Sequence, residues 1–374
     1  MNLQAPHYSD WKEVELGEVC EFAYGKSLPA KARSGSVYPV YGSNGPVGLH
    51  EAALTEGATI VIGRKGSFGE VHYSSGPCWP IDTTYYVTQE QTEAYLPWLV
   101  RQLRCLDLKE LNRAAAIPGL NRTDAYRQKM LLPPLADQKR IAGILDAADA
   151  LRAKRRESIA QLDSLLQSTF LDMFGDPVTN PMGWETFKIG QVGEVITGNT
   201  PSRKHPEYYG DGIEWIKSDN INNPSFTLTA AEEHLSAEGK RVARTAPEGS
   251  ILVTCIAGSP SCIGNVAVAN REVAFNQQIN AFVPGDRIKS WFAFGMFWVG
   301  KRLIQGASTN SMKGMVSKSA FSSISIPVPP LSLQQLFTAI FESCERQKSQ
   351  MIAHLAELDA LFASLQSRAF SGEL

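Results

Sequence analysis

Several glycine-rich segments of this chain carry donor-rich polar side chains beside aromatic residues. Lys, Arg, Ser and Thr hold phosphates well, whereas Arg, Asn and Gln form paired hydrogen bonds with base edges. These residue types therefore indicate contacts with DNA. The candidate contact residues are Lys26, Ser27, Tyr41, Ser43, Asn44, Arg64, Lys65, Ser67, Asn121 and Arg122 in the first half, and Asn199, Thr200, Ser202, Arg203, Lys204, Tyr208, Lys217, Ser218, Asn220, Gln277, Gln278 and Lys313 in the second. Each segment alone is also typical of an ordinary turn, but such segments recur in both halves.

No motif for catalysis or for a cofactor stands out. Gly25-Lys26-Ser27 resembles the end of a phosphate-binding loop, but Cys20 occupies the place where that loop needs a glycine. The run from Gly63 to Gly69 lacks dinucleotide-loop spacing and leads into another strand-like stretch, so a hairpin turn is expected there. The chain has no Asp/Asn-Pro-Pro-aromatic tetrad of an amino-methyltransferase and no nucleophile elbow. The sequence thus predicts a non-catalytic protein without a cofactor.

Composition narrows the class of protein. The chain has 374 residues, is 43% hydrophobic and has a net charge of −2, which favours a globular protein with more than one core and argues against a general nucleic-acid binder. The six cysteines show no Cys-x-x-Cys spacing and the six histidines are scattered, so we expect no disulfide framework, no metal site and a reduced, cytoplasmic protein. The polar first residues and the short apolar run 291–300 predict neither a signal region nor a membrane span.

The chain is an imperfect internal repeat. Trp11 followed by Leu16-Gly17 returns as Trp184 followed by Ile189-Gly190. Glu56-Gly57 before a strand-like run returns as Glu248-Gly249, and Pro133-Pro134-Leu135 with Gln138 returns as Pro329-Pro330-Leu331 with Gln334. Two copies are too few for a solenoid. A duplicated pair favours one body with an approximate two-fold axis, suited to a target with two parts.

Each copy divides into a mixed part and a long helix. Strand-like runs at 58–62 and 84–87 in the first copy match 250–254 and 279–283 in the second, and short helices are expected at 96–111 and 290–304. After each Pro-Pro-Leu, apolar residues recur at steps of three and four, the pattern of a coiled-coil seam. We therefore expect an α+β fold in which the two long helices pair antiparallel. A helical hairpin that merely closes a core is the alternative. The basic cluster at 152–156 is expected on the solvated side of its helix.

The ordered set of motifs resembles the specificity subunit of type I restriction-modification systems over the whole length. The resemblance rests on Trp-x4-Leu/Ile-Gly at 11–17 and 184–190, Gly198–Ser202, Tyr38–Gly45, the two Pro-Pro-Leu-x2-Gln helix starts and the closing segment 369–374. It implies target-recognition domains at 1–134 and 177–330, and spacer helices at 135–176 and 331–374 that set their separation.

The resemblance also implies partners. It predicts binding to double-stranded DNA with a bipartite target, docking of two methylation subunits that hold the methyl donor, and joining of restriction subunits. Because the loops differ between copies, the two half-sites should differ too. Other hypotheses remain open at this point: an assembly scaffold built on the helices, an enzyme of mixed fold with an unrecognised site, and a free-standing specificity subunit that serves methylation only.

Overall fold

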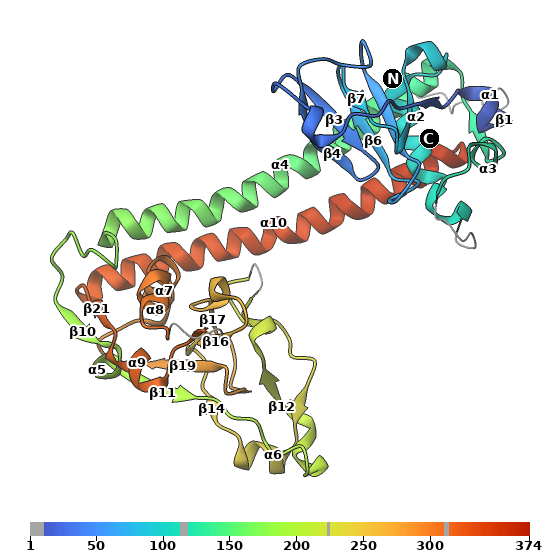
Figure 1. Cartoon of the computed structure of the whole chain (residues 1–374). Helices are drawn as coiled ribbons and strands as arrows, with labels where there is room; N and C mark the ends of the chain where they lie inside the picture. Colours follow the sequence, from blue (N-terminus) through green and yellow to red (C-terminus); the bar gives the residue numbers. More distant parts are fainter. Residues whose placement is uncertain (1–10, 113–118, 223–224, 310–313) are drawn as a thin grey trace, which may run out of the picture. The chain divides into compact units, whose positions relative to one another are not determined.

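A computed structural model describes residues 11–112, 119–222, 225–309 and 314–374 (Figure 1). The chain forms two compact units, one from the residues up to 156 together with 353–374, and one from residues 157–352. Two long helices, α4 (Leu135–Phe174) and α10 (Leu331–Ser371), each contribute to both units. Their extents agree with the two helices expected after the Pro-Pro-Leu motifs.

The first unit is built around a four-stranded antiparallel sheet in the order β2-β8-β5-β6. A three-stranded sheet β4-β3-β7 lies beside it, and β1 pairs with β9. The bounds are β1 Lys12–Glu15, β2 Ala23–Tyr24, β3 Tyr38–Gly42, β4 Gly45–His50, β5 Thr59–Gly63, β6 Val71–Ser74, β7 Trp79–Pro80, β8 Thr84–Val87 and β9 Lys129–Leu132. The expected hairpin turn at 63–69 is confirmed, because it joins the antiparallel strands β5 and β6.

The second unit repeats this topology. Its four-stranded sheet β11-β19-β15-β17 matches β2-β8-β5-β6, and β10 pairs with β21 as β1 pairs with β9. In the sheet β13-β12-β18-β14, strands β12 and β18 are parallel, as are β3 and β7 in the first unit. The bounds are β10 Thr186–Lys188, β11 Gly193–Thr197, β12 Tyr209–Ile216, β13 His234–Leu235, β14 Thr245–Ala246, β15 Ile251–Thr254, β16 Ile256–Ala257, β17 Val266–Val268, β18 Val273–Phe275, β19 Ile279–Pro284, β20 Gly314–Met315 and β21 Ser325–Pro327.

The central strands are the continuous apolar runs of the sequence. Every residue of β5 and of β15 is buried, which explains why neither shows the alternation of a half-exposed strand. The core of the first unit gathers Trp98, Phe22 and Leu16, and that of the second gathers Phe170, Phe292 and other aromatic rings. The strands predicted at 58–62, 84–87, 250–254 and 279–283 are therefore confirmed.

The short helices deviate slightly from expectation. The helix expected at 96–111 is α2 (Leu96–Cys105), because Asp107 adopts a φ of 44° and the chain continues as a 3-10 helix over Leu108–Asn112. The helix expected at 290–304 is split at Gly300 into α7 (Ser290–Val299) and α8 (Lys301–Gly306). The other α-helices of the described residues are α1 Leu16–Val19, α3 Arg122–Tyr126, α5 Ile189–Val192, α6 Ala237–Val242 and α9 Lys318–Ser323.

A repeated glutamine ties the start of each long helix to its unit. The Gln138 amide accepts a hydrogen bond from the Tyr95 backbone N–H (2.8 Å) and donates to the Pro133 carbonyl (2.8 Å). Gln334 does the same with Lys289 N–H (2.9 Å) and Pro329 carbonyl (2.8 Å). Both glutamines are buried. The Pro-Pro-Leu-x2-Gln motif is thus the joint between the mixed part and the helix.

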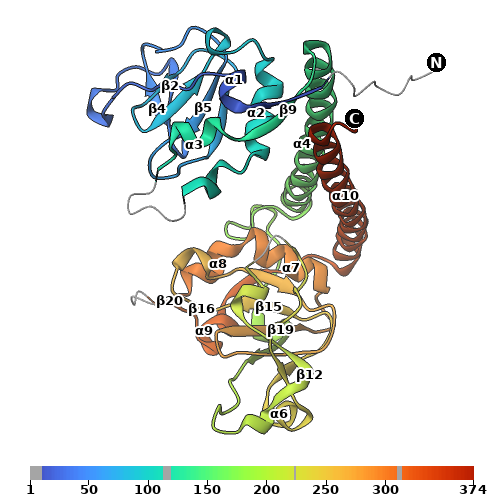
Figure 2. The same ribbon diagram turned by 90° about the vertical axis from the view of Figure 1, so that its right-hand side faces the viewer.

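Within each unit, the parts of α4 and α10 lie side by side and run in opposite directions (Figures 1 and 2). In the first unit Arg152 Nε of α4 lies 2.5 Å from Asp359 Oδ1 of α10. In the second unit Lys348 Nζ of α10 lies 2.7 Å from Asp163 Oδ1 of α4. The repeat aligns Leu162-Asp163 with Leu358-Asp359, which also aligns Arg152 with Lys348. The same cross-helix ion pair therefore occurs twice, and the predicted antiparallel pairing is confirmed.

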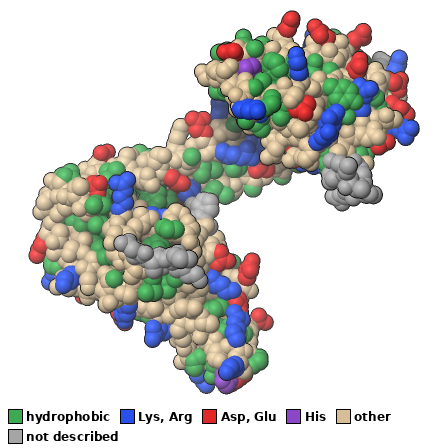
Figure 3. Space-filling model, viewed as in Figure 1, with side chains coloured by type: hydrophobic (Ala, Val, Ile, Leu, Met, Phe, Trp, Pro, Cys, Tyr) green, Lys and Arg blue, Asp and Glu red, His purple; other side chains and the backbone are tan. Residues whose placement is uncertain are grey.

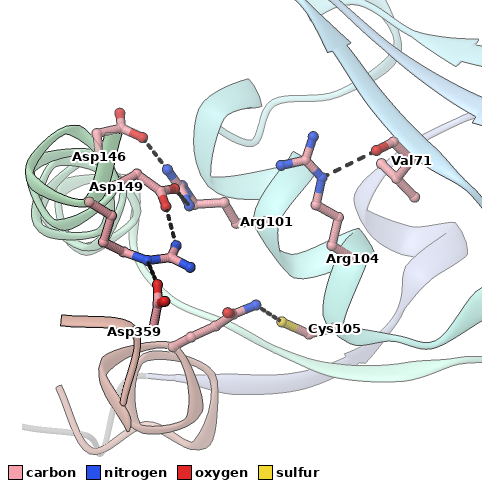
Figure 4. Close-up of polar contacts among 9 residues, drawn as sticks. Val71, Arg101, Arg104, Cys105, Asp146, Asp149 and Asp359 are labelled. Atoms are coloured by element: carbon pink, nitrogen blue, oxygen red, sulfur yellow. Dashed lines mark hydrogen bonds and ion pairs between the residues drawn. The ribbon is translucent and has the colours of Figure 1, made fainter. Parts of the chain in front are cut away.

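The expectation for the basic cluster at 152–156 is wrong at its first residue. The Arg152 side chain is 18% exposed and faces α10, where it also lies over the Phe362 ring with Cζ 4.3 Å from the centroid. Asp149 bonds both Arg152 and Arg101 of α2, and Arg101 also bonds Asp146 (Figure 4). The sequence around 152–156 does not reveal this burial, because the partners of Arg152 lie on α10 or one helical turn away on α4.

In the second unit, the carboxylate equivalent to that of Asp149 belongs to Glu345 and has fewer polar partners. Glu345 aligns with Asp149 through the repeat, and its Oε1 is buried without a hydrogen-bond partner in the described chain. Burial raises the pKa of Glu345, Lys348 lowers it and Asp163 raises it further. A carboxyl group whose pKa is raised on folding stabilises the fold below its unfolded pKa, and this contribution is lost as the pH rises through its folded pKa.

We therefore expect Glu345→Gln to increase the free energy of unfolding of the second unit at pH 7 by about 1 kcal/mol. The difference from the wild type should shrink as the pH falls to about 4, where the native carboxyl group is protonated. Urea unfolding at both pH values measures this. A Glu342→Gln variant, on the exposed side of the same helix, is the control. If both variants changed the free energy of unfolding equally at each pH, burial of the Glu345 carboxylate would not be the cause of the expected gain.

Candidate nucleic-acid interface

A cluster of tyrosine and arginine side chains occupies the end of the central sheet in the first unit. Tyr24 ends β2, and the residue is 52% exposed. Arg64, which follows β5, places its Cζ 5.2 Å from the Tyr24 ring centroid, and Arg122, at the start of α3, places its Cζ 5.3 Å from it. Tyr85 of β8 meets Tyr24 edge to face at 5.2 Å. Strands that are distant in sequence thus bring these side chains together.

Backbone contacts fix this cluster in place. The Leu120 N–H donates to the Arg64 carbonyl (2.8 Å), and Lys65 and Gly119 form an isolated antiparallel β-bridge. The Tyr85 hydroxyl donates to the Leu120 carbonyl (3.2 Å), and burial raises the pKa of Tyr85, so the phenol stays protonated. The same residues, with Asn121 and Thr123, line an open hollow of about 540 Å³. The result is a concave surface with cationic walls.

The loop after β2 and the loop after β11 each begin with a glycine, because the backbone there comes too close for a side chain. A Cβ on Gly25 would lie 2.1 Å from the Ile81 carbonyl oxygen, just after β7. A Cβ on Gly198 would lie 2.2 Å from the Asn276 carbonyl oxygen, just after β18. These are equivalent places in the two copies. Each glycine lets its loop, with Lys26 in one copy and Thr200 in the other, leave the end of the sheet at the same point.

The second unit has a comparable cluster with a different charge balance. Arg203 stacks on Tyr209 with Cζ 4.2 Å from the ring centroid, and Lys217 Nζ lies 5.4 Å from the centroid of Trp215. Here, however, Glu233 forms ion pairs with both Arg203 and Lys217. The hydrogen bonds from Arg203, helped by Lys217 and opposed by burial, lower the pKa of Glu233 to about 2. Glu233 therefore remains an anion and neutralises part of this surface.

The candidate contact residues of the sequence fall into groups by exposure. Half are exposed: Lys26, Ser27, Asn44, Lys65, Ser67, Asn121, Thr200, Ser202, Arg203, Lys204 and Gln277. Seven are half-buried: Arg64, Arg122, Asn199, Tyr208, Lys217, Ser218 and Gln278. Tyr41, Ser43 and Asn220 are buried. Lys313 lies outside the described residues.

Several of these side chains already have structural partners. The Ser43 hydroxyl donates to the Thr83 carbonyl (2.7 Å), and the Asn220 amide joins Lys217 N–H to the Ala230 carbonyl. Asn199 bonds the backbone at Val242 and Arg244. These groups hold loops in shape. The exposed pair Thr200 and Gln277, in contrast, joins two loops at the surface through a hydrogen bond.

Sequence reasoning missed the residues that depend on long-range contacts. Tyr24 lies directly before the noted segment Gly25-Lys26-Ser27, and its exposure next to two arginines is visible only in the fold. Glu233 is separated from Arg203 by 30 positions, so no local pattern reveals the pairing. The stacking of Arg203 on Tyr209 and Trp215 likewise joins residues that are separated in the sequence.

The surface is not uniformly basic. Lys and Arg side chains are interspersed with Asp and Glu on the face of each unit shown in Figure 3, in keeping with the net charge of −2. Burial raises the pKa of the Cys20 and Cys255 thiols to about 12, so both remain protonated at neutral pH. Across the parts of the chain that the structure describes, no group of three His, Cys, Asp or Glu side chains is arranged to hold a metal ion. None of the helices described there is long and apolar enough to cross a membrane.

The chain matches the family described as the type I restriction modification DNA specificity domain in two segments, residues 8–162 and 181–357. These two segments cover most of the chain, so it belongs to this family. It is 31% identical over 177 residues to the specificity subunit of the type I restriction enzyme HindI from Haemophilus influenzae. That match covers 43% of this chain and 36% of the relative, so the chain spans little more than a third of the relative's length.

Solved structures share the fold. The S subunit of a type I restriction-modification system from M. genitalium superposes with a TM-score of 0.60 at 14% identity, covering 99% of this chain and 97% of that one. A chain solved in a study of complex assembly and conformational transition of the type I R-M system gives a TM-score of 0.61 at 19% identity, with both chains fully covered. The resemblance read from the sequence and the α+β fold with a domain in each copy are therefore confirmed.

Proposed function

We propose that this chain is the sequence-specific DNA-binding specificity subunit of a type I restriction-modification complex. Each copy of the repeat would read one half of an interrupted target. The boundaries expected from sequence, 1–134 and 177–330, would delimit the two recognition domains. The proposal is supported by the family membership and by the presence, in both units, of arginines stacked on aromatic rings beside polar loops.

The observation that carries the proposal is that the same fold presents unlike side chains in its two copies. The first unit offers Arg64 and Arg122 around Tyr24, and the second offers Arg203 and Lys217 held by Glu233. Base recognition depends on which donors and acceptors reach the groove. Two unlike surfaces on one fold therefore favour an asymmetric bipartite target, with two different half-sites.

The chain would act through partners. We propose that two methylation subunits bind it and supply the methyl donor site and the extrusion of the target adenine, and that restriction subunits join this assembly. The chain itself would contribute recognition and no reaction of its own. Gln138 and Gln334 anchor the two long helices in the same way. This repetition supports one equivalent docking surface on each copy.

Substitutions in one unit should change only one half of the recognised motif. Thr200→Val with Gln277→Leu removes exposed polar groups of the second unit, and Asn44→Ala with Ser67→Ala does so in the first. Loss of one good base contact costs about 1–3 kcal/mol of discrimination, or roughly tenfold or more. We expect each double variant to relax specificity in a different half-motif.

Methylome sequencing of cells that express each variant with the methylation subunit measures this. The half-motif read by the unaltered unit serves as the internal control. If either double variant relaxes both half-motifs together, or if both variants alter the same half, the assignment of one reader to each copy is wrong.

A further inference from the structure

We infer that Tyr24, Arg64 and Arg122 form a clamp for the phosphate backbone of DNA and do not read base edges. We call these three residues the Tyr24 clamp. The inference rests on the proposed function and adds a division of labour to it. The clamp would set the register of the first recognition domain on the duplex, and exposed side chains of neighbouring loops would supply the sequence readout.

The first argument is charge. In the described residues neither Arg64 nor Arg122 has a carboxylate ion-pair partner, and Lys65 adds a third cation on the rim of the same hollow. In the second unit, Glu233 already neutralises the stacked Arg203. A concave surface with uncompensated cations on a chain of net charge −2 is suited to a polyanion.

The second argument is reach. Both guanidinium groups lie against aromatic rings, with Cζ of Arg64 5.8 Å from the Tyr85 centroid and Cζ of Arg122 5.8 Å from the Tyr126 centroid. The side chains are therefore folded back on the surface and line a hollow. Base edges lie at the floor of a major groove about 8.5 Å deep, which only a protruding side chain reaches. The phosphate backbone is the convex part of the duplex, and a hollow accommodates it.

The third argument is preorganisation. The Arg64 backbone is held by Thr83 and Leu120, and an Arg122 guanidinium N–H donates to the Phe22 carbonyl at 3.4 Å. The Tyr24 ring lies close to both guanidinium groups. An arginine that is positioned before binding loses less side-chain freedom when it meets a phosphate. This role accounts for the exposure of Tyr24, whose aromatic ring lies on the surface between the two guanidinium groups.

The test is a salt titration of DNA binding. The full chain, assembled with its methylation subunit, is titrated with a random-sequence duplex at several salt concentrations. The slope of log K against log salt is negative, and each lost phosphate contact reduces its magnitude by about 0.9. We expect Arg64→Gln and Arg122→Gln each to reduce the magnitude by about that amount, and the double variant by about 2. Lys12→Gln, an exposed cation elsewhere in the unit, should leave the slope unchanged.

Two further variants separate the clamp from a base reader. Arg122→Lys keeps the positive charge, so under the clamp hypothesis it should keep both the salt slope and the preference for the cognate motif. If Arg122 instead formed two hydrogen bonds with a base, lysine could not replace them, and the preference for the cognate motif would fall. Tyr24→Phe should bind as the wild type does, and Tyr24→Ala should bind more weakly without any change in formal charge. Circular dichroism confirms that each variant is folded.

The outcomes are distinct. Slopes of smaller magnitude with an unchanged ratio of cognate to random-sequence binding support the clamp. An unchanged slope with a reduced ratio would assign the arginines to base readout, and no change in either quantity would place the Tyr24 clamp away from DNA; both results overturn the inference. A wild-type assembly that binds no DNA would instead refute the proposed function itself.

Discussion

Replacement of Gln334 with leucine is expected to lower the free energy of unfolding of the second unit by about 2 kcal/mol. The Gln334 side chain is fully buried. Its amide accepts from Lys289 N–H (2.9 Å) and donates to the carbonyls of Pro329 (2.8 Å) and Arg287 (3.1 Å). Leucine fills the space and leaves these backbone groups without partners. An unsatisfied buried polar group costs about 1–3 kcal/mol, which is more than a typical net hydrogen bond contributes.

The matched control is Gln335→Leu, which makes the same chemical change at the exposed neighbouring position. Urea unfolding gives the free energy, and hydrogen exchange at the start of α7 shows whether the Lys289 amide has lost its protection. Gln138→Leu should destabilise the first unit in the same way, because Gln138 makes the equivalent bonds to Tyr95 and Pro133. Equal losses for Gln334→Leu and Gln335→Leu would contradict the role of the repeated glutamine as a joint.

Replacement of Glu233 with glutamine is expected to strengthen binding to random-sequence DNA about tenfold at moderate salt. In the native chain Glu233 forms ion pairs with Arg203 and Lys217 and, with a pKa of about 2, stays ionised at any physiological pH. Glutamine preserves the shape and removes the charge. Both cations then become available to phosphates, and two more phosphate contacts would steepen the salt dependence by about 1.8.

The expected cost is specificity. A surface with two additional uncompensated cations binds all sequences more tightly, so the ratio of cognate to random-sequence affinity should fall. Glu232→Gln, which removes the neighbouring exposed carboxylate, controls for the change in net charge. If Glu233→Gln left random-sequence affinity and its salt dependence equal to those of Glu232→Gln, the ion pairs of Glu233 with Arg203 and Lys217 would not restrain DNA binding.

Much of the fold followed from local patterns in the sequence. The buried runs 60–62 of β5 and 251–253 of β15 are apolar throughout, and each is bounded by glycine or polar residues, so their existence needed no tertiary information. The long helices were predictable from apolar residues at steps of three and four after Pro-Pro-Leu. The break after Cys105 was not, because it depends on Asp107 adopting a left-handed backbone conformation, which its neighbours in sequence do not dictate.

The candidate site could be predicted only in outline. Arg64 and Arg122 were selected for their residue type, but their convergence on Tyr24 depends on β2, β5 and α3 meeting at one end of the sheet. Glu233 could not be found, since its partners lie 16 and 30 positions earlier in the sequence. Burial also distinguished residues that sequence treats alike: Ser43 and Ser67 are both serines in glycine-rich loops, yet Ser43 is buried and bonded to Thr83 while Ser67 is exposed.

The most direct test of the central proposal is to co-express this chain with its methylation subunit and sequence the host DNA at single-molecule resolution for methylated adenine. We expect a split motif of two short, unlike half-sites, which disappears when this chain is omitted. A contiguous motif would contradict the assignment of one half-site to each copy. An active methylation subunit that produces the same motif without this chain would contradict the specificity function as a whole.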